Sequence, residues 1–527
     1  MSTRKTVGEH LVDLLEARGV DTVFGIPGVH TVELYRGLAT SKIRHVTPRH
    51  EGSAGFMADG YARVAGKPGV CFLITGPGLT NVITAMGQAR ADSIPMLVIS
   101  GVNRRATLGN EVGHLHELPD QAGMMRTVAL YTHTLLNGAD LPAVLDRAFA
   151  AMLSARPGPV HIEVPIDVMS EVIDLAPYRP LPLPSREPGA AEVEAAAALA
   201  APARAPVILA GGGAKHADAA LRRLAEHLDA PVVTTVNGRG LLAGHPLEVP
   251  ASPSRGPVRD LIAASDLVIA VGTQIGPTDY DIDLDGKLPK MARLIRIDVD
   301  ALQATRGAVA EAVIIADAEK GLEALAARLG PVRATGAARA AAARKAAFDG
   351  LSAKMKGEVE VIRTITAALP GAAIVGDSTQ LVYAGNYYAE ISRPGAWFNA
   401  ATGFGSLGYG PSAAIGAALA DPDGRPVVCL VGDGGFQFCL SDIGAAVDEK
   451  ARVIFLVWNN TGYGEIESYM IQNRITPVGV RPSAPDFAAV AKAYGMPAEA
   501  LDGVEGLKAA LERAAAAMPS LIEVRLP

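Results

Sequence analysis

The chain has 527 residues, of which 49% are hydrophobic and 20% charged, and its formal net charge is −7. This length exceeds what one hydrophobic core usually serves, so we expect about two to four domains. The negative charge argues against nucleic acid as a partner, because binding to phosphates needs a basic field. Only three cysteines occur, and none is spaced like a metal or redox pair, which suits a reducing compartment.

The N-terminal segment, residues 1–19, follows an amphipathic helix pattern and contains no apolar core of a signal peptide. The longest uncharged stretch, residues 401–420, holds five glycines and a proline and would make a poor membrane-spanning helix. We therefore expect a cytoplasmic protein without a membrane partner.

Strands and helices alternate along the whole chain. The first third predicts helices at 7–18, 54–64 and 79–90 and strands at 22–24, 70–74 and 95–100. The middle predicts strands at 206–210, 231–236, 267–271 and 293–299 and a helix at 217–228. The last third predicts strands at 373–375, 427–431, 453–458 and 520–525. Repeated units of this kind indicate doubly wound parallel sheets.

Two segments divide the chain. Residues 177–188 (PYRPLPLPSREP) are rich in proline, lack apolar periodicity and read as an extended linker. An Ala/Arg/Lys-rich stretch at 334–347 predicts a surface helix or linker with a solvated basic face. We predict three α/β domains, 1–176, 189–332 and 351–527, joined by linkers at 177–188 and 333–350.

The stretch Val427–Asn460 carries the clearest chemical signal. An apolar run ends at Gly432-Asp433-Gly434, and a second apolar run, after a helix-like segment, ends at Asn459-Asn460. Two parallel strands joined by a crossover helix would place Asp433 and Asn460 side by side at the strands' carboxyl ends, where ligands bind in open α/β sheets. Carboxylate and amide oxygens suit Mg²⁺, and the glycines allow a phosphate to approach the backbone.

This pattern resembles the thiamine diphosphate motif, a GDG triplet followed after a few tens of residues by NN. By that resemblance Asp433 and Asn460, 27 positions apart, hold Mg²⁺ through their side chains, and the main-chain carbonyl of Gly462 is the third ligand. The alternative is an ordinary βαβ unit with a turn aspartate and an asparagine pair at the end of a strand.

The resemblance extends over essentially the full chain, to the three-domain architecture of the thiamine diphosphate decarboxylase and acetolactate synthase superfamily. It implies pyrimidine-binding, central and diphosphate-binding domains, in that order. The segment RHVTPRHE followed by the helix GSAGFMADGYAR resembles the site of the carboxylate that activates the cofactor, which makes Glu51 the candidate. A glutamate favoured by the helix dipole would explain Glu51 alone.

Further candidate cofactor residues follow from the same resemblance. The GPG-x-TN loop would lie beside the aminopyrimidine, the GDSTQ segment would bind the diphosphate, and Leu407 would be wedged between the two cofactor rings. These residues are Gly76, Pro77 and Asn81; Asp377, Ser378, Thr379 and Gln380; Gly405, Ser406 and Leu407; and Gly432, Gly434, Gly435 and Tyr463.

The resemblance also implies an oligomer, because in this family the Glu-bearing domain of one subunit faces the diphosphate domain of another. Glu51 and Asp433 would then share a site only across a dimer interface, with a homodimer as the active unit or a homotetramer built from it.

Two histidines on loops, His30 and His116, are candidates for proton handling. His30 could equally be a surface turn residue.

The reaction can be narrowed by two departures from the acetolactate synthases. Where these carry Phe-Gln-Glu, this chain has Leu115-His116-Glu117, and where they bind FAD through Arg-Phe-Asp-Asp, it has GTQIGPTD, which puts FAD in doubt. Several runs, including GIPGVHTVELYRGL and TPVGVRPSAPDFA, resemble 5-guanidino-2-oxopentanoate (2-ketoarginine) decarboxylase.

A guanidinium substrate needs an acidic partner. The segment after the metal site offers Glu465, Glu467 and Tyr469 for the substrate pocket, although a solvated helix face explains either glutamate as well. We therefore expect non-oxidative decarboxylation of a 2-oxo acid with thiamine diphosphate and Mg²⁺. The alternatives are carboligation of two pyruvates, as in acetolactate synthase, and a non-catalytic paralogue.

Overall fold

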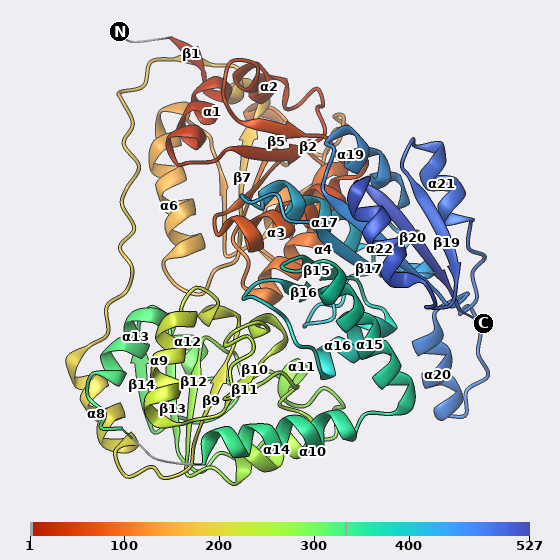
Figure 1. Ribbon diagram of the computed structural model, residues 1–527. Helices are drawn as coiled ribbons and strands as arrows, with labels where there is room; N and C mark the ends of the chain where they lie inside the picture. Colours follow the sequence, from red (N-terminus) through yellow and green to blue (C-terminus); the bar gives the residue numbers. More distant parts are fainter. Residues whose placement is uncertain (1–3, 332–334, 527) are drawn as a thin grey trace.

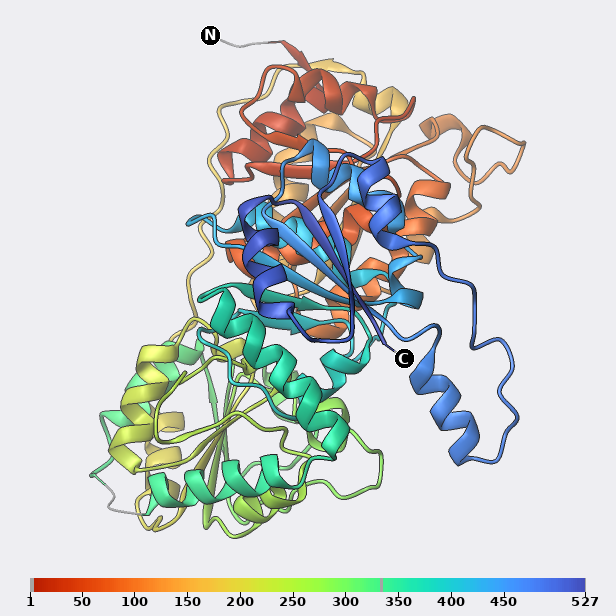
Figure 2. The same cartoon turned by 45° about the vertical axis from the view of Figure 1, so that its right-hand side comes forward.

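The computed structural model describes residues 4–331 and 335–526, and in this part of the chain three six-stranded parallel sheets define three units (Figures 1 and 2). This arrangement confirms the predicted fold class. The first unit contains β2 (Thr22–Gly25), β3 (Arg44–Val46), β4 (Gly69–Leu73), β5 (Met96–Val102), β6 (Tyr131–Thr134) and β7 (Pro159–Pro165). The middle unit contains β9 (Pro206–Ala210), β10 (Val232–Thr234), β11 (Glu248–Val249), β12 (Leu267–Val271), β13 (Leu294–Asp298) and β14 (Ala312–Ile315). The third unit contains β15 (Ala373–Gly376), β16 (Trp397–Asn399), β17 (Val427–Gly432), β18 (Val453–Asn459), β19 (Ala498–Asp502) and β20 (Ser520–Arg525).

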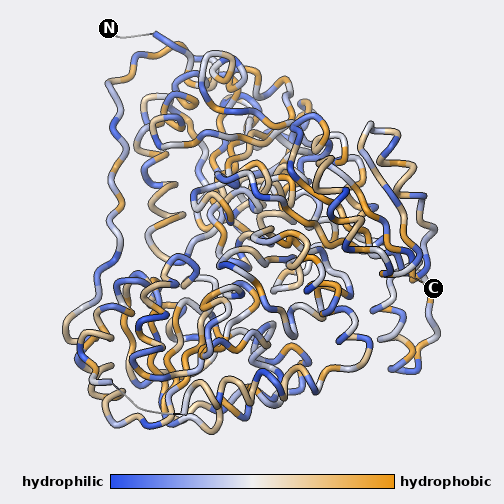
Figure 3. Tube along the Cα trace, viewed as in Figure 1, coloured by the Kyte–Doolittle hydropathy of each residue, from blue (hydrophilic) through white to orange (hydrophobic). Residues whose placement is uncertain are grey.

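The strand orders reveal a relationship between the first and third units. The first sheet runs β3-β2-β4-β5-β7-β6 and the third runs β16-β15-β17-β18-β20-β19, which is the same order once strands are numbered within each unit. The middle sheet runs β11-β10-β9-β12-β13-β14, which within this unit is the order 3-2-1-4-5-6 found in dinucleotide-binding folds. Buried on both faces, the strands consist of nearly continuous apolar residues, and the hydrophobic parts of the trace in Figure 3 gather at the centres of the units.

One hydrophobic core is shared by the first and third units. It is formed by helices α3 (Glu51–Ala65) and α4 (Pro77–Asp92) of the first unit and α17 (Tyr409–Ala420) of the third, together with the inner faces of both sheets. Helices α3 and α17 touch through their backbones: a Cβ on Gly60 would lie 1.9 Å from Ala413 O, and one on Gly416 would lie 1.9 Å from Met57 O. Only glycine fits these two positions, so the helix pair joins the two units tightly.

The remaining faces are covered by other helices. The outer face of the first sheet is packed by α1 (Val7–Ala17), α2 (Val32–Leu38) and α6 (Leu141–Leu153), and that of the third by α15 (Ala353–Ala368), α16 (Gln380–Tyr387) and α22 (Leu507–Ala516). The middle sheet lies between α8 (Ala190–Ala200), α9 (Asp218–Leu228) and α13 (Ala318–Ala326) on one face and α10 (Gly256–Ala263) and α14 (Gly336–Asp349) on the other. Within the described residues, no helix combines the length and apolar character needed to cross a membrane.

One expectation differs from the structure in detail. The crossover after Asp433 is not one helix: it consists of α18 (Asp433–Phe436), a 3₁₀ turn and α19 (Ile443–Asp448). The second predicted linker contains a helix, α14, which buries Ala340, Ala343 and Ala347 against the middle unit and exposes its other side. The start of that linker, with residues 333–334, lies outside the described residues. Residues 177–188 contain no helix or strand, and this segment runs between the first and middle units along one side in Figure 1.

Candidate active site

A cavity of about 450 Å³ lies at the carboxyl ends of β15, β17 and β18. The strands β17 and β18 are direct neighbours, with Gly432 opposite Trp458, so the two ligand-bearing loops that follow them meet at the same edge. Among the predicted site residues, those that line this cavity are Ser378, Thr379, Gln380, Gly405, Leu407, Gly432, Asp433, Gly434, Gly435, Asn460, Gly462, Tyr463 and Glu465.

Three oxygens converge in the cavity from Asp433, Asn460 and Gly462. One end of the Asn460 side-chain amide lies 2.7 Å from the carbonyl oxygen of Gly462 and 3.1 Å from Asp433 Oδ1. With its nitrogen at this end the amide donates to both oxygens, and with its oxygen there the three groups form a set of facing acceptors. Asp433 is 1% exposed, and its Oδ2 atom has no hydrogen-bond partner. Such a set of facing acceptors fits a hard cation, because a bound Mg²⁺ would satisfy all of them.

Backbone geometry places these oxygens. Gly462 has φ 151°, and a Cβ there would lie 2.5 Å from Val480 O, so glycine is required at this turn. Burial raises the pKa of Asp433, although the backbone N–H of Asn460 donates to Oδ1 at 3.3 Å and opposes that shift. A cation would stabilise the ionised form further.

Asp377 does not line the cavity. Its carboxylate accepts hydrogen bonds from Ser378 N (2.8 Å) and Gly410 N (3.0 Å), and burial raises its pKa to about 6. It therefore ties the Ser378–Thr379 loop to the start of α17 and supports the cavity wall from behind. Ser378 and Thr379 themselves reach the cavity, at the end of β15, where their hydroxyls and amides can bind a phosphate.

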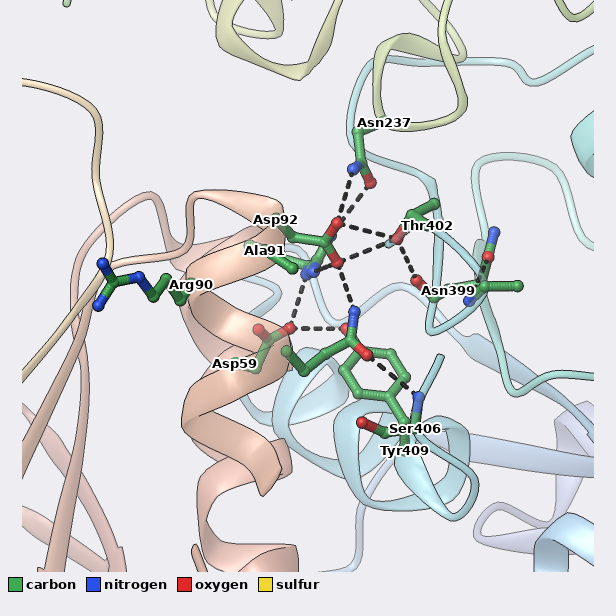
Figure 4. Close-up of polar contacts among 12 residues, drawn as sticks. Asp59, Arg90, Ala91, Asp92, Asn237, Asn399, Thr402, Ser406 and Tyr409 are labelled. Atoms are coloured by element: carbon green, nitrogen blue, oxygen red, sulfur yellow. Dashed lines mark hydrogen bonds and ion pairs between the residues drawn. The ribbon is translucent and has the colours of Figure 1, made fainter. Parts of the chain in front are cut away.

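Ser406 connects the cavity wall to the first unit. Its backbone N–H donates to Gln88 Oε1 at 3.3 Å, and its buried Oγ has no partner. Gln88 donates to Asp92 Oδ2 at 2.8 Å and thereby belongs to a buried polar cluster that joins all three units, several members of which are labelled in Figure 4. The members of this cluster are Asp59 and Arg63 on α3, Gln88 and Asp92 on α4, Asn237 of the middle unit, and Asn399, Thr402, Ser406 and Tyr409 of the third.

Arg63 is the centre of this cluster. Its guanidinium donates to Asp59 Oδ1 at 2.6 Å and to Asp92 Oδ2 at 2.7 Å, and Tyr409 Oη donates to the same Asp59 oxygen at 2.6 Å. Thr402 Oγ1 donates to Asp92 at 2.9 Å. All these side chains are almost fully buried, so the charges depend on one another for stabilisation.

The variant Arg63→Met is expected to lower the free energy of unfolding by about 3–5 kcal/mol, because it leaves two carboxylates buried without their counter-charge. Chemical unfolding followed by circular dichroism measures this. The matched control is Arg36→Met, which removes an arginine paired with Glu33 at the surface and should change stability little. Equal losses in the two variants would contradict a stabilising role for the cluster.

Glu51 begins α3, and Asn81 Nδ2 donates to its Oε2 at 2.9 Å. The structure thus brings together the predicted carboxylate and the predicted GPG-x-TN loop, with Gly76 and Pro77 at the start of α4. Glu51 is not among the residues that line the cavity containing Asp433. The two halves of the predicted cofactor site therefore do not line this cavity together.

Gln121 was not anticipated as a site residue. Its Oε1 accepts from Thr75 Oγ1 (2.6 Å) and Gly76 N (3.0 Å), and its Nε2 donates to Gly101 O (3.1 Å) and Glu163 Oε2 (2.8 Å). Every hydrogen-bonding position of this buried amide is used, and the Gly76 loop is fixed as a result. The only signal in the sequence was the Asp-Gln pair that follows Leu115-His116-Glu117.

His30 and His116 come from different loops and lie beside each other, with ring centroids 5.4 Å apart. The Nδ1 atoms of both rings are buried and have no hydrogen-bond partner. Burial, together with the neighbouring His116, lowers the pKa of His30. His116 also packs against Gly76, since a Cβ on that glycine would lie 2.5 Å from His116 O.

The three predicted substrate-pocket residues on α20 (Gly464–Gln472) have different surroundings. Glu465 lines the cavity and accepts from Gln380 Nε2 at 2.9 Å. Glu467 instead forms a bidentate pair with Arg481, at 2.9 and 3.1 Å, and Tyr469 is 64% exposed. Helix α20 buries none of its residues and projects from the third unit in Figure 2.

Other residues line the cavity without having been predicted: Thr278 of the middle unit, Tyr383, Ala401, Gly403, Gly464 and Ile466. Tyr383 lies one helical turn after Thr379, a spacing that could have indicated it. No sequence signal pointed to Thr278.

A second, larger cavity of about 840 Å³ lies where the middle sheet reverses its strand order, between β9 and β12. The Gly211–Gly213 turn, Gly272 and Gln274 contribute to its wall, together with Arg63 and Asp92 of the first unit. The stretch GTQIGPTD, which stands where the synthases have their FAD motif, therefore borders this space.

Comparison with known proteins agrees with this geometry. Three family models match the chain: "Thiamine pyrophosphate enzyme, N-terminal TPP binding domain" at residues 5–124, the central domain of the same enzymes at 193–325, and their C-terminal TPP binding domain at 377–524. The N- and C-terminal models cover the elements that carry Glu51 and Asp433.

Among curated proteins, a probable 2-ketoarginine decarboxylase of Pseudomonas aeruginosa is 46% identical over 508 residues, covering 93% of this chain and 88% of the relative. The large subunit of acetolactate synthase isozyme 1 of Escherichia coli is 30% identical over 554 residues, covering 100% of this chain and 95% of the relative. A probable acetolactate synthase large subunit of Methanocaldococcus jannaschii is 31% identical over 538 residues, covering 96% and 89%. The first relative is thus considerably more similar than the two synthases.

Proposed function

Because the chain belongs to the thiamine pyrophosphate enzyme family, we propose that it is a thiamine diphosphate- and Mg²⁺-dependent decarboxylase of 2-oxo acids, with 5-guanidino-2-oxopentanoate as substrate. The observation that carries this proposal is the cluster of facing oxygens from Asp433, Asn460 and Gly462 beside the glycine-rich cavity. The relative at 46% identity supports the choice of substrate.

The chain's own residues divide the work. Asp433, Asn460 and the Gly462 carbonyl would hold Mg²⁺, and Ser378 and Thr379 would bind the diphosphate. When bound, thiamine diphosphate supplies an electron sink for the electron pair left as CO₂ departs. The Glu51 carboxyl, oriented by Asn81, would hydrogen-bond to the pyrimidine ring and hold a proton there.

His30 and His116 are proposed to handle the proton that completes the aldehyde product. Their adjacent rings and free Nδ1 atoms provide a donor and an acceptor beside the Gly76 loop. Acetolactate synthases, for which protonation would be a side reaction, carry a glutamine where His116 stands in this chain. This difference favours decarboxylation over carboligation.

We further propose that the active unit is a homodimer, with a tetramer as the larger assembly. Glu51 does not line the cavity of Asp433 in its own chain, so a second copy is needed to supply it.

FAD is not part of the proposed reaction, although the second cavity offers space for a nucleotide. The three free, buried cysteines agree with a cytoplasmic location, where thiols stay reduced.

A panel of 2-oxo acids tests the proposed function. The purified protein with thiamine diphosphate and Mg²⁺ is assayed for CO₂ release from 5-guanidino-2-oxopentanoate, from neutral 2-oxo acids and from pyruvate, with acetolactate measured in parallel. The expected result is the highest kcat/KM with the guanidino acid and no acetolactate. Acetolactate as the main product of pyruvate would instead establish the synthase alternative.

The variant Asp433→Ala is expected to lose Mg²⁺-dependent cofactor binding, because it removes the only charged group among the three proposed ligands. Cofactor retained after desalting in the presence of Mg²⁺, converted to thiochrome and measured by fluorescence, reports this directly. Asp423→Ala, which removes an exposed carboxylate paired with Arg425 in the same unit, serves as the control. Normal cofactor retention by Asp433→Ala would show that the metal lies elsewhere.

A further inference from the structure

Glu358 on α15 is a buried carboxylate that no sequence pattern singled out. Its side chain is only 7% exposed, and its Oε1 atom has no hydrogen-bond partner. An unpaired acceptor inside a protein costs free energy, and an unpaired charge costs more. A ligand or partner that donates a hydrogen bond to this oxygen would therefore be stabilising.

Glu358 shares a cation with Glu465, the one predicted substrate-pocket glutamate that lines the cavity. The ammonium of Lys354 lies 3.8 Å from Glu358 Oε1 and 3.7 Å from Glu465 Oε1. Both contacts are too long for hydrogen bonds. Lys354 therefore offsets the negative charge of the two carboxylates but donates no hydrogen bond to either. Lys354 and Glu465 are 60% and 47% exposed, so a ligand can reach this position from solvent.

The carboxylates of Glu358 and Glu465 repel each other, and Lys354 offsets this repulsion only in part. Burial, reinforced by the nearby Glu465 carboxylate and opposed by Lys354, raises the pKa of Glu358 to about 7. Glu465 is held in place by Gln380, which also lines the cavity. Glu467 is already occupied by Arg481 and is therefore not available to the same ligand.

A guanidinium has the donors that this pair lacks. Its planar fork presents five N–H groups and bonds carboxylates at two points, whereas an ammonium is a point charge. One guanidinium could donate to Glu358 and Glu465 together and displace the loosely held Lys354.

We propose that Glu358 and Glu465 form the subsite for the cationic tail of the substrate, with Lys354 as the internal cation that the tail displaces. This inference rests on the proposed function, since it assigns a place to the guanidinium of a 2-oxo acid bound at the cavity. In this assignment Glu358 determines specificity by binding the cationic tail of the substrate, whereas Glu467 does not contact the tail.

The test compares two substrates in two variants. Steady-state kinetics are measured with 5-guanidino-2-oxopentanoate and with 2-oxohexanoate, which has an uncharged tail. Glu358→Gln is expected to lower the preference for the guanidino acid, expressed as the ratio of the two kcat/KM values, by about tenfold or more through a higher KM. Glu360→Gln, on the same helix but paired with Arg363 at the surface, should leave the ratio unchanged. An unchanged ratio in Glu358→Gln would overturn the proposal.

Lys354→Met gives a second, independent measurement. Without the internal cation, the carboxylate pair should bind the guanidino acid more tightly, so the preference should rise. A preference that stays the same or falls would mean that substrate does not displace Lys354, and the subsite would be rejected. If the wild-type enzyme itself shows no preference for the guanidino acid, the proposed function fails before the subsite is tested, so the two failures can be told apart.

Discussion

Replacing Glu51 by glutamine is expected to lower kcat by about 10² to 10⁴ while thiamine diphosphate stays bound, which is the usual contribution of a positioned acid or base. Glutamine keeps the shape of the side chain and its hydrogen bond to Asn81, but it can no longer exchange a proton with the cofactor's pyrimidine ring. Cofactor content and CO₂ release measured on the same sample separate binding from turnover.

A partly buried glutamate outside the proposed site provides the control. Glu33→Gln, on α2 and paired with Arg36, carries the same chemical change in the first unit and should turn over at the wild-type rate. Unchanged turnover in Glu51→Gln would remove this residue from the mechanism. Loss of bound cofactor would point to a binding role and would equally contradict the proposal.

The meeting of Asp433 and Asn460 could be predicted from sequence because it depends on local rules. Two apolar runs joined by a short crossover form adjacent parallel strands, and their carboxyl ends then share an edge. The strands β17 and β18 pair in this way, and the expected loops meet. The same reasoning predicted eleven of the eighteen strands described in the three sheets to within a few residues, but it missed β3, β6, β7, β11, β14, β16 and β19.

Contacts between distant segments had no such signal. The backbone contact of α3 with α17, through Gly60 and Gly416, joins residues more than 350 positions apart. The sequence of neither helix indicates that it packs against the other. The buried Arg63–Asp59–Asp92 cluster looks in sequence like ordinary charges on two helices. Only the fold shows that they are buried and face Tyr409 and Thr402 of another unit.

Glu358 illustrates the same limit at the site. In the run KMKGEVEV it alternates with apolar residues beside Glu360, and the two glutamates cannot be distinguished by pattern. Packing of α15 against the third sheet buries Glu358 and exposes Glu360. The same holds for Glu465 and Glu467 on α20. Arg481 forms an ion pair with Glu467, whereas Glu465 accepts a hydrogen bond from Gln380. Both partners lie outside α20, so the sequence of the helix does not show which glutamate is paired with an arginine.

Two inactive variants are expected to restore activity when their subunits are mixed. Glu51 and Asp433 do not line one cavity in a single chain, so in a symmetric dimer each complete site would take Glu51 from one subunit and Asp433 from the other. A heterodimer of Glu51→Gln and Asp433→Ala subunits would then hold one intact site and one site that lacks both groups. Random mixing makes about half of the dimers mixed, so about a quarter of all sites should work.

The experiment requires that subunits exchange, which is achieved by coexpressing the two variants with different affinity tags and purifying the doubly tagged dimer. In that dimer half of the sites should be active. The control is a dimer in which one subunit is wild type and the other carries both substitutions: each of its sites lacks one group, so it should be inactive. If Glu51 and Asp433 instead acted within one chain, the results would be reversed, since the wild-type subunit would keep its own site and the mixed variants would have none. The two dimers have the same composition of substituted residues, so their opposite activities would depend only on how the two units of one chain face those of its partner.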